Sequence, residues 1–229
     1  MVMVNDNNAY FIRKYNFDVY ICDIMSYKII VARYDEDIQW LRSEMINCII
    51  YNKGTRLGFN NEIILENVGR ESETYLQYII TNYDNLPDVV VFTQARISDH
   101  KGSDDVNYLI NIKNQALSNT KSDNLLIHND IGDNICWDKE WNLRQDGYFL
   151  KDNYKNNRPI TFLEWFKMNI SADYPNPIKI YCNAIFAVRK ECIINKPIDY
   201  YKKLVLEVNH HNNPSEGHFF ERSWYYIFD

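Results

Sequence analysis

The sequence predicts an α/β protein, a single Rossmann-like domain with a mostly parallel central sheet flanked by helices. Three short apolar segments, 29–32, 47–54 and 89–92, have the character of buried strands. Helical or long connections separate them, as right-handed parallel crossovers require. The third segment, VVVF, is β-branched and does not alternate, which is typical of a central parallel strand buried on both faces.

The chain is expected to divide into an N-terminal arm, residues 1–27, and the α/β domain, residues 28–229. Within the arm, residues 18–25 alternate and predict an edge strand. Beyond the strand at 29–32, apolar residues recur at helical spacing and predict a helix that Asp35 could cap.

A second helix is predicted from Glu71 to just before Pro87, because the residue before a proline avoids the helical conformation. The segment EIILEN, 62–67, could be a short strand or a loop. Further along, we expect helices within 103–121, 161–170, 197–208 and 218–228, a strand at 125–128, a strand or hairpin within 178–190 and a surface insertion at 144–158.

Bulk properties exclude several function classes. The net charge of -6 argues against a nucleic-acid partner, since such binding depends on Lys and Arg contacts to phosphates. No apolar run approaches the roughly 20 residues of a membrane span. The five cysteines are an odd number and lie mostly in apolar runs, which indicates buried thiols in a reducing, cytoplasmic compartment.

Three carboxylates, Asp35, Glu36 and Asp37, follow the first buried strand of the domain. They could bind the hydroxyls of a nucleotide or a divalent metal. Alternatively, they favour the dipole at the N-terminus of the following helix.

Asn67, Gly69 and Arg70 form a loop ahead of the second helix. The amides at this helix start could receive a phosphate, and the guanidinium fork of Arg70 suits a diphosphate. A capped helix with a surface salt bridge would account for the same residues.

Polar residues follow the strand VVVF abruptly, and ligands of open α/β sheets bind outside the carboxyl ends of strands. We therefore expect Gln94, Arg96, Asp99 and His100 at the mouth of a cleft. Asp99 and His100 could bind a metal together, or one of them could orient the other. The zinc motifs HxxH, HExxH and CxxC are absent from the sequence.

Near the C-terminus, Glu216 and His218 are expected to precede the last helix and Glu221 to lie one turn into it. A carboxylate and an imidazole could thus reach one cleft and act in proton transfer. Trp224 is expected to pack in the core rather than to stack on a substrate. The absence of GxSxG, P-loop and GxGxxG motifs excludes serine hydrolases, kinases and dehydrogenases of the usual types.

The ordered series IVARYDEDIQWL, IIYNKG, NVGRESETYLQYIITNYDNLPDVVVFTQA, ISDH, NAIFAVRKECIINKPIDYYKKL and HFFERSWYYIF resembles a family of unknown function found in fungi, bacteria and large DNA viruses. Its members look like glycosyltransferases of the A type, with a Rossmann-like nucleotide-sugar fold. The resemblance covers about residues 28–229.

The resemblance implies roles for particular residues. Tyr34 to Glu36 is similar to the Tyr-Asn-Glu turn with which such transferases hold the nucleotide, with Asp35 in place of the asparagine. Thr93-Gln94-Ala95 stands where they carry the metal-binding Asp-x-Asp motif, so manganese or magnesium would be held by Asp99 and His100, or the diphosphate by arginines. The residues expected to contact the nucleotide-sugar donor are Arg33, Tyr34, Glu36, Asn67, Arg70, Gln94 and Arg96.

The expected activity is transfer of a sugar from a nucleotide-sugar donor to a hydroxyl of a glycan, a protein or a small molecule. Glu216, Glu221 and His218 are the candidate catalytic residues. Because Asp-x-Asp is absent, a non-catalytic nucleotide- or sugar-binding module on the same fold is a second interpretation. A structural or interaction protein that uses its tyrosine-rich surface is a third.

Overall fold

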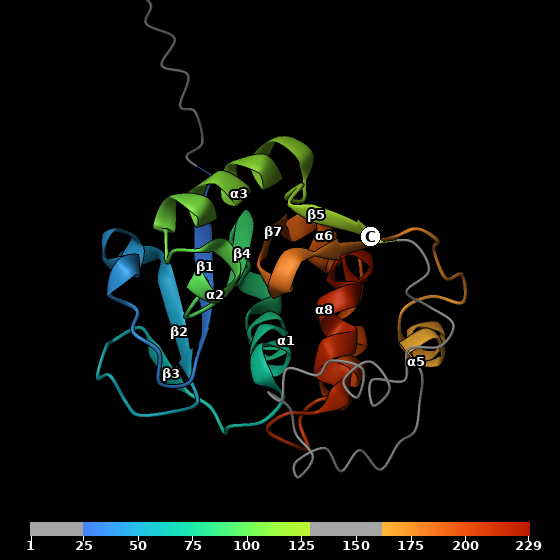
Figure 1. The fold of residues 1–229 in the computed structure, drawn as a ribbon, viewed down its shortest axis with the longest axis horizontal. Coiled ribbons are helices and arrows are strands. Elements are labelled where there is room, and N and C mark those ends of the chain that lie inside the picture. Colours follow the sequence, from blue (N-terminus) through green and yellow to red (C-terminus); the bar gives the residue numbers. More distant parts are fainter. Residues whose placement is uncertain (1–24, 129–161) are drawn as a thin grey trace, which may run out of the picture.

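The computed structural model describes residues 25–128 and 162–229. Helices cover both faces of a central five-stranded sheet, and a two-stranded sheet lies beside it (Figure 1). The prediction of a mixed α/β protein with a mostly parallel central sheet flanked by helices is confirmed. The insertion at 144–158 and the predicted edge strand at 18–25, except for its last residue, lie outside the described residues.

The central sheet has the strand order β3-β2-β1-β4-β7. Strands β1 to β4 are parallel to one another, and β7 runs antiparallel to β4. In the register, Ile29 of β1 pairs with Cys48 of β2 on one side and Val91 of β4 on the other. The strands are β1 (Tyr27–Arg33), β2 (Cys48–Asn52), β3 (Glu62–Ile64), β4 (Val89–Gln94) and β7 (Phe186–Arg189).

Both faces of the central strands are buried, which explains their unbroken apolar sequences. Ile29 and Val31 of β1 face the helices η1 (Gln39–Asn47) and α3 (Val106–Asn119). Ile30 faces the opposite layer, which contains α1 (Arg70–Asn82) and α8 (Ser215–Ile227). The chain therefore crosses the sheet on both sides, and the carboxyl ends of the parallel strands meet at one edge.

The remaining elements complete the layers. Strands β5 and β6 pair antiparallel, so the segment 178–190 is divided between two sheets. The turn η3 separates β6 from β7, with Asn183 and Ala184 both at positive φ. The elements outside the central sheet that have not yet been given are η2 (Tyr83–Asn85), α2 (Ser98–Lys101), β5 (Leu125–His128), α5 (Phe162–Asn169), β6 (Ile178–Tyr181), η3 (Cys182–Ala184), α6 (Lys190–Ile194) and α7 (Ile198–Val205).

Two local predictions were wrong. Asp35 does not cap the helix after β1, because that helix is a 3-10 helix that follows Ile38, and the Asp35 carboxylate accepts a hydrogen bond from the backbone N of Thr55 (2.8 Å). The last helix begins directly after Pro214, so Glu216 and His218 lie in its first turn instead of preceding it.

An aromatic cluster fixes α8 against α1 and the sheet. The ring of Tyr75 on α1 lies 4.8 Å from that of Phe92 on β4 and 5.6 Å from that of Trp224 on α8. Trp224 has no exposed surface and stacks on Phe228, which confirms its expected role in packing. Within the described ranges, no helix has the length and apolar character needed to cross a membrane.

Candidate functional site

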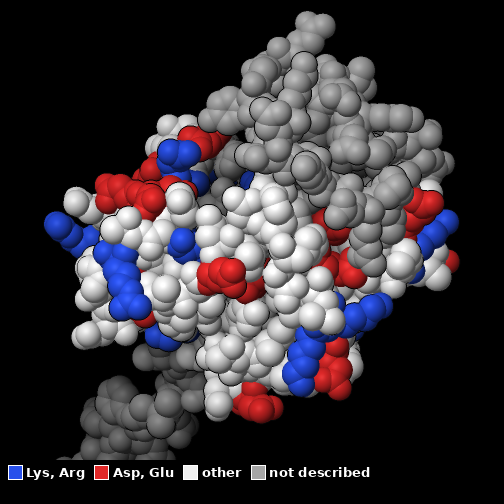
Figure 2. All heavy atoms as spheres, turned by 90° about the horizontal axis from the view of Figure 1, so that it is seen from below, with Lys and Arg blue, Asp and Glu red and all other residues white. Residues whose placement is uncertain are grey.

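The carboxyl ends of the parallel strands point to the lower edge of the molecule in Figure 1. Figure 2 shows that side from below, with acidic and basic side chains interspersed among uncharged ones over the described surface. Two features of interest occur at this edge: a cavity beside β1, and a cluster of charged side chains where the N-termini of α1 and α8 meet.

The cavity has a volume of about 530 Å³ and lies beside the carboxyl end of β1. Its wall comes from the loop after β1, from η1 and from the loop between β2 and β3. The wall combines carboxylates with apolar side chains and two arginines: Arg33, Asp35, Glu36, Asp37, Ile38, Gln39, Arg42, Met45, Leu57 and Phe59. A mixed lining of this kind, in a pocket of this size, is typical of small-molecule sites.

Arg33 holds the cavity loop in place. Its guanidinium donates to Asn52 Oδ1 (2.8 Å), to the backbone oxygen of Thr55 (2.9 Å) and to the backbone oxygen of Glu36 (2.9 Å). The side chain is buried, and these bonds join the loop after β1 to the end of β2. Arg33 thus shapes the wall of the cavity from behind.

Gly54 allows the two loops to approach. A Cβ at this position would lie 1.9 Å from the backbone oxygen of Tyr34, so any side chain would force the loops apart. The neighbouring Thr55 amide donates to Asp35, and this hydrogen bond lowers the pKa of the Asp35 carboxyl. Asp35 is therefore ionised at neutral pH, at the rim of the cavity.

Tyr34 and Glu36, both expected to contact the nucleotide, lie in the loop after β1, and Glu36 lines the cavity. The Glu36 carboxylate accepts from the backbone N of Tyr34 (2.7 Å), and the Tyr34 side chain is exposed. Of the two, Glu36 is the one in position to contact a ligand in the cavity.

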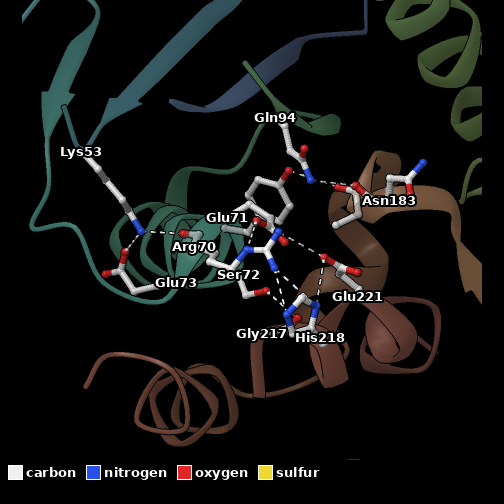
Figure 3. Close-up of polar contacts among 12 residues, drawn as sticks. Lys53, Arg70, Glu71, Ser72, Glu73, Gln94, Asn183, Gly217, His218 and Glu221 are labelled. Carbon is white, nitrogen blue, oxygen red and sulfur yellow. Dashed lines mark hydrogen bonds and ion pairs between the residues drawn. The ribbon is translucent and has the colours of Figure 1, made fainter. Parts of the chain in front are cut away.

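The charged cluster is centred on Arg70. Its Nη1 lies 3.1 Å from Nε2 of His218, its Nη2 lies 3.8 Å from the Glu221 carboxylate, and its Nε lies 3.6 Å from the Glu71 carboxylate. Figure 3 shows these side chains converging from α1 and α8. The fold thus brings together three of the predicted site residues, Arg70, His218 and Glu221.

The backbone at the start of α1 is strained. Gly69 and Arg70 both have positive φ, 64° and 52°. Gly69 also has no room for a side chain, since a Cβ would lie 2.8 Å from the backbone oxygen of Val208. A non-glycine residue in the left-handed conformation costs about 1–2 kcal/mol, and such strain gathers at functional sites.

Lys53 at the end of β2 supports this strained turn, and the sequence analysis missed it. Its Nζ lies 2.8 Å from the Glu73 carboxylate, with both side chains 5% exposed, and donates to the backbone oxygens of Arg70 (2.6 Å) and Val68. One signal was available in the sequence, because a cation directly after an apolar strand lies at the ligand-facing edge of the sheet.

Protonation differs among the groups around Arg70. Burial lowers the pKa of His218 to about 4, and the positive charges of Arg70 and Arg222 act in the same direction. Burial opposes ionisation of Glu221, but the neighbouring His218 and the charge of Arg70 outweigh it and lower the pKa to about 2. Burial raises the pKa of Glu71. At neutral pH the cluster therefore combines a neutral imidazole with an ionised Glu221.

The other predicted site residues lie at different depths. Glu216 is buried, with 1% of its surface exposed, whereas Asn67 is exposed in the loop ahead of α1. Gln94, the last residue of β4, donates from Nε2 to the backbone oxygen of Asn183 in η3 (3.1 Å). Gln94 therefore joins the end of β4 to the strained turn of η3, beside the Arg70 cluster (Figure 3).

The proposed metal ligands Asp99 and His100 are consecutive exposed residues of α2. The Asp99 carboxylate lies 2.9 Å from Nε of Arg96, and both side chains are more than half exposed. In the part of the chain that the structure describes, no three His, Cys, Asp or Glu side chains are grouped so that they could hold a metal ion.

The model of one protein family, described as "Protein of unknown function (DUF3431)", matches residues 29–229. The match includes all the strands of the central sheet except the first two residues of β1, and every residue of the cavity and of the Arg70 cluster. No curated protein and no solved structure matches the chain.

Proposed function

This chain belongs to the DUF3431 family of proteins of unknown function, and we propose that it is a glycosyltransferase. In this proposal it moves a sugar from a nucleotide-sugar donor to an acceptor hydroxyl. The observation that carries the proposal is the cavity at the carboxyl end of β1, which is one of the two strands between which the order of the parallel strands reverses.

The strand order supports a Rossmann-like reading of the sheet. The four parallel strands have the order β3-β2-β1-β4, and doubly wound nucleotide-binding sheets have this order in their first four strands. In such sheets the crevice between the two central strands that diverge, here β1 and β4, receives the ligand. The antiparallel β7 extends the sheet beyond β4, as mixed α/β sheets allow.

The cavity suits the nucleoside part of a donor. Leu57 and Phe59 offer an apolar surface for a base, and Glu36 and Asp37 offer acceptors for ribose hydroxyls. Carboxylates would repel phosphates, so we place the diphosphate outside the cavity, toward the guanidinium of Arg70 at the same edge of the sheet. Arg70 keeps 31% of its side chain exposed and so remains accessible.

The transfer needs a group that receives the proton of the acceptor hydroxyl. As the acceptor oxygen bonds to the anomeric carbon, the bond to the diphosphate breaks and its electron pair leaves with the phosphate. Glu221 is 23% exposed and ionised, so it can orient the hydroxyl and take its proton late in the reaction, when the oxygen has become acidic. His218, 5% exposed as a side chain, orients Glu221.

A divalent metal, which many donor sites use to neutralise the diphosphate, does not fit the described residues. Asp99 and His100 supply two ligand groups, and Asp99 is engaged by Arg96. We therefore derive no catalytic step through a metal, and manganese enters the test below as a variable.

One observation favours the alternative of a non-catalytic binding module. Glu216 and His218 are both at least 95% buried, which leaves Glu221 as the accessible group among the three catalytic candidates. A module of this kind would bind the nucleotide in the cavity and consume no donor.

A thermal-shift screen with nucleotide sugars, with and without manganese, tests the proposal, because a bound ligand stabilises the folded state by mass action. We expect a rise in melting temperature with at least one nucleotide sugar, and release of its nucleoside diphosphate when an acceptor is added. Binding without release would favour the module. Absence of any shift would overturn both readings and favour an interaction protein.

A matched pair of variants locates the ligand. Asp37 lines the cavity and accepts from the backbone N of Gln39 (3.0 Å), while Asp105, the N-cap residue of α3, accepts in the same way from the backbone N of Asn107 (2.8 Å). Asp37→Asn should reduce the nucleotide-induced shift and Asp105→Asn should leave it unchanged. Equal shifts in both variants would remove the cavity from the proposal.

A further inference from the structure

The cavity and the Arg70 cluster are built on opposite sides of the same short segment, the end of β2. Asn52 accepts from Arg33 through Oδ1 (2.8 Å) and donates through Nδ2 to Thr55 O (2.7 Å), which fixes the cavity wall. The next residue, Lys53, points the other way and contacts the first turn of α1 (Figure 3). Two consecutive residues thus touch the two halves of the candidate site.

The contacts of Lys53 all converge on the strained turn. Its ammonium group donates to the carbonyls of Val68 and Arg70, which flank Gly69, and pairs with the Glu73 carboxylate one turn further into α1. The two carbonyls take two of the three donors of the ammonium group, and the Glu73 carboxylate 2.8 Å away opposes its charge. The side chain is 5% exposed, so the charge of Lys53 is buried in the company of a counter-charge.

Arg70 depends on this turn for its direction. Its φ of 52° is a conformation that a non-glycine residue adopts only when its surroundings impose it. Lys53 stabilises this turn, because it binds the carbonyl of Arg70 itself. With the backbone fixed in this way, the guanidinium extends toward α8 and lies between His218 and Glu221.

We infer that Lys53 is a positioning residue of the site. By holding the Val68–Arg70 turn, it directs the Arg70 guanidinium toward the diphosphate position and toward His218 and Glu221. It also links this half of the site to the cavity. The role in the reaction rests on the proposed function. The control of Arg70 geometry by Lys53 does not, and it can be measured without any substrate.

The test replaces both members of the buried pair. Lys53→Met alone would leave the Glu73 carboxylate buried without a partner, so the informative variant is Lys53→Met/Glu73→Gln, which removes both charges and keeps side chains of similar length. The matched control is Lys121→Met. Lys121 also binds a carboxylate and a carbonyl, those of Asp229 (2.7 Å) and Phe228 (3.4 Å), at the opposite end of α8.

The readout is the titration of the His218 imidazole by NMR on histidine-labelled protein, with the signal assigned by its loss in His218→Asn. Burial is the main cause of the lowered pKa of His218, and the positive charge of Arg70 acts in the same direction. If Lys53 positions Arg70, the double variant should show a raised His218 midpoint, while Lys121→Met leaves it unchanged. A double variant that loses stability but keeps the wild-type His218 midpoint would overturn the inference, because a purely structural lysine would behave in that way.

Donor binding separates this inference from the proposed function. In the thermal-shift assay we expect the double variant to lose most of the shift with a nucleotide sugar and to keep the shift with the nucleoside alone. A wild-type protein that shows no shift with any nucleotide sugar would refute the proposed function, while the His218 result would still decide the role of Lys53.

Discussion

Nη1 of Arg70 lies 3.1 Å from Nε2 of His218, although 148 residues separate the two in sequence. The contact exists because Arg70 begins α1 at a positive φ of 52° and His218 lies in the first turn of α8. A strained arginine beside a buried, neutral imidazole is costly for stability. The first two predictions concern these two residues.

Replacing Arg70 by glycine should be less harmful to stability than replacing it by alanine. Both changes remove the guanidinium, but glycine adopts positive φ freely whereas alanine retains the strain. We expect Arg70→Gly to be about 1 kcal/mol more stable than Arg70→Ala in urea unfolding. Equal stabilities would mean that the backbone at Arg70 relaxes once the side chain is removed.

Stability should fall as the pH is lowered from about 6.5 to about 4, partly through His218. The pKa of His218 is about 4 in the folded protein and near 6.5 in the unfolded protein, so the unfolded state binds more protons in this window. Lowering the pH therefore stabilises the unfolded state relative to the folded state. The gap between the two pKa values corresponds to at most about 3 kcal/mol. Above pH 6.5 the histidine contributes no slope.

Comparison with His218→Asn isolates this contribution. Glu71 acts in the opposite direction, because its raised pKa lets the folded state hold a proton that the unfolded state releases above pH 4.5. Both proteins share Glu71, so the difference between their unfolding free energies from pH 4.5 to 7 reports mainly on His218. A difference that does not change with pH would contradict the neutral imidazole.

The buried Lys53–Glu73 pair should show strong coupling. Removing one partner leaves the other charge buried without compensation, which typically costs about 3–5 kcal/mol. We expect Lys53→Met to lose about that much stability, and Lys53→Met/Glu73→Gln to lose less than the single variant. Chemical unfolding of the wild type, both single variants and the double variant gives the coupling energy. Additive losses would contradict a direct ion pair.

The sequence predicted much of the sheet, because the buried parallel strands β1, β2 and β4 are continuous apolar segments. It did not predict that β6 and β7 belong to different sheets. The turn between them requires positive φ at Asn183 and Ala184, and neither residue type indicates this conformation as a glycine would. The helix after β1 was mistaken for an α-helix because its apolar spacing does not distinguish a 3-10 helix.

The candidate site was predictable in part. Arg70, His218 and Glu221 were identified from residue type and local position, and packing of α1 against α8 brings them together. The position of Lys53 after an apolar strand places it at the ligand-facing edge, but its partners are backbone carbonyls of a distant loop, which the sequence does not reveal. Arg33, which was predicted to contact the donor, lines the cavity, and its guanidinium is bound to the cavity loops, a partnership that depends on the β1–β2 register and that the sequence did not predict.

Gly54→Ala should disrupt the cavity. The added Cβ would lie 1.9 Å from the backbone oxygen of Tyr34, so the loop after β1 must move, at a cost of about 1–3 kcal/mol. Gly102→Ala is the control, because Gly102 has positive φ (78°) and no heavy atom within 4 Å of an added Cβ. We expect the control to lose about 1 kcal/mol and to keep nucleotide binding, and Gly54→Ala to lose binding as well. Retained binding in Gly54→Ala would separate the loop from the ligand site.

Phe59→Ala should weaken nucleotide binding with little effect on stability. The Phe59 side chain is 44% exposed and lines the cavity, so in the free protein it packs little, whereas a base stacked on it would cover its ring. Aromatic stacking is worth about 1 kcal/mol beyond the buried area, so the dissociation constant for a nucleoside diphosphate should rise roughly fivefold to tenfold in calorimetric titration.

Ile46→Ala is the matched control for Phe59→Ala, because Ile46 is 85% exposed and does not line the cavity. Its dissociation constant should equal that of the wild type, and both variants should unfold within about 0.5 kcal/mol of it. If Phe59→Ala binds as tightly as Ile46→Ala, the base does not occupy the apolar side of the cavity. The acidic side, formed by Glu36 and Asp37, would then have to hold the ligand by its hydroxyls alone.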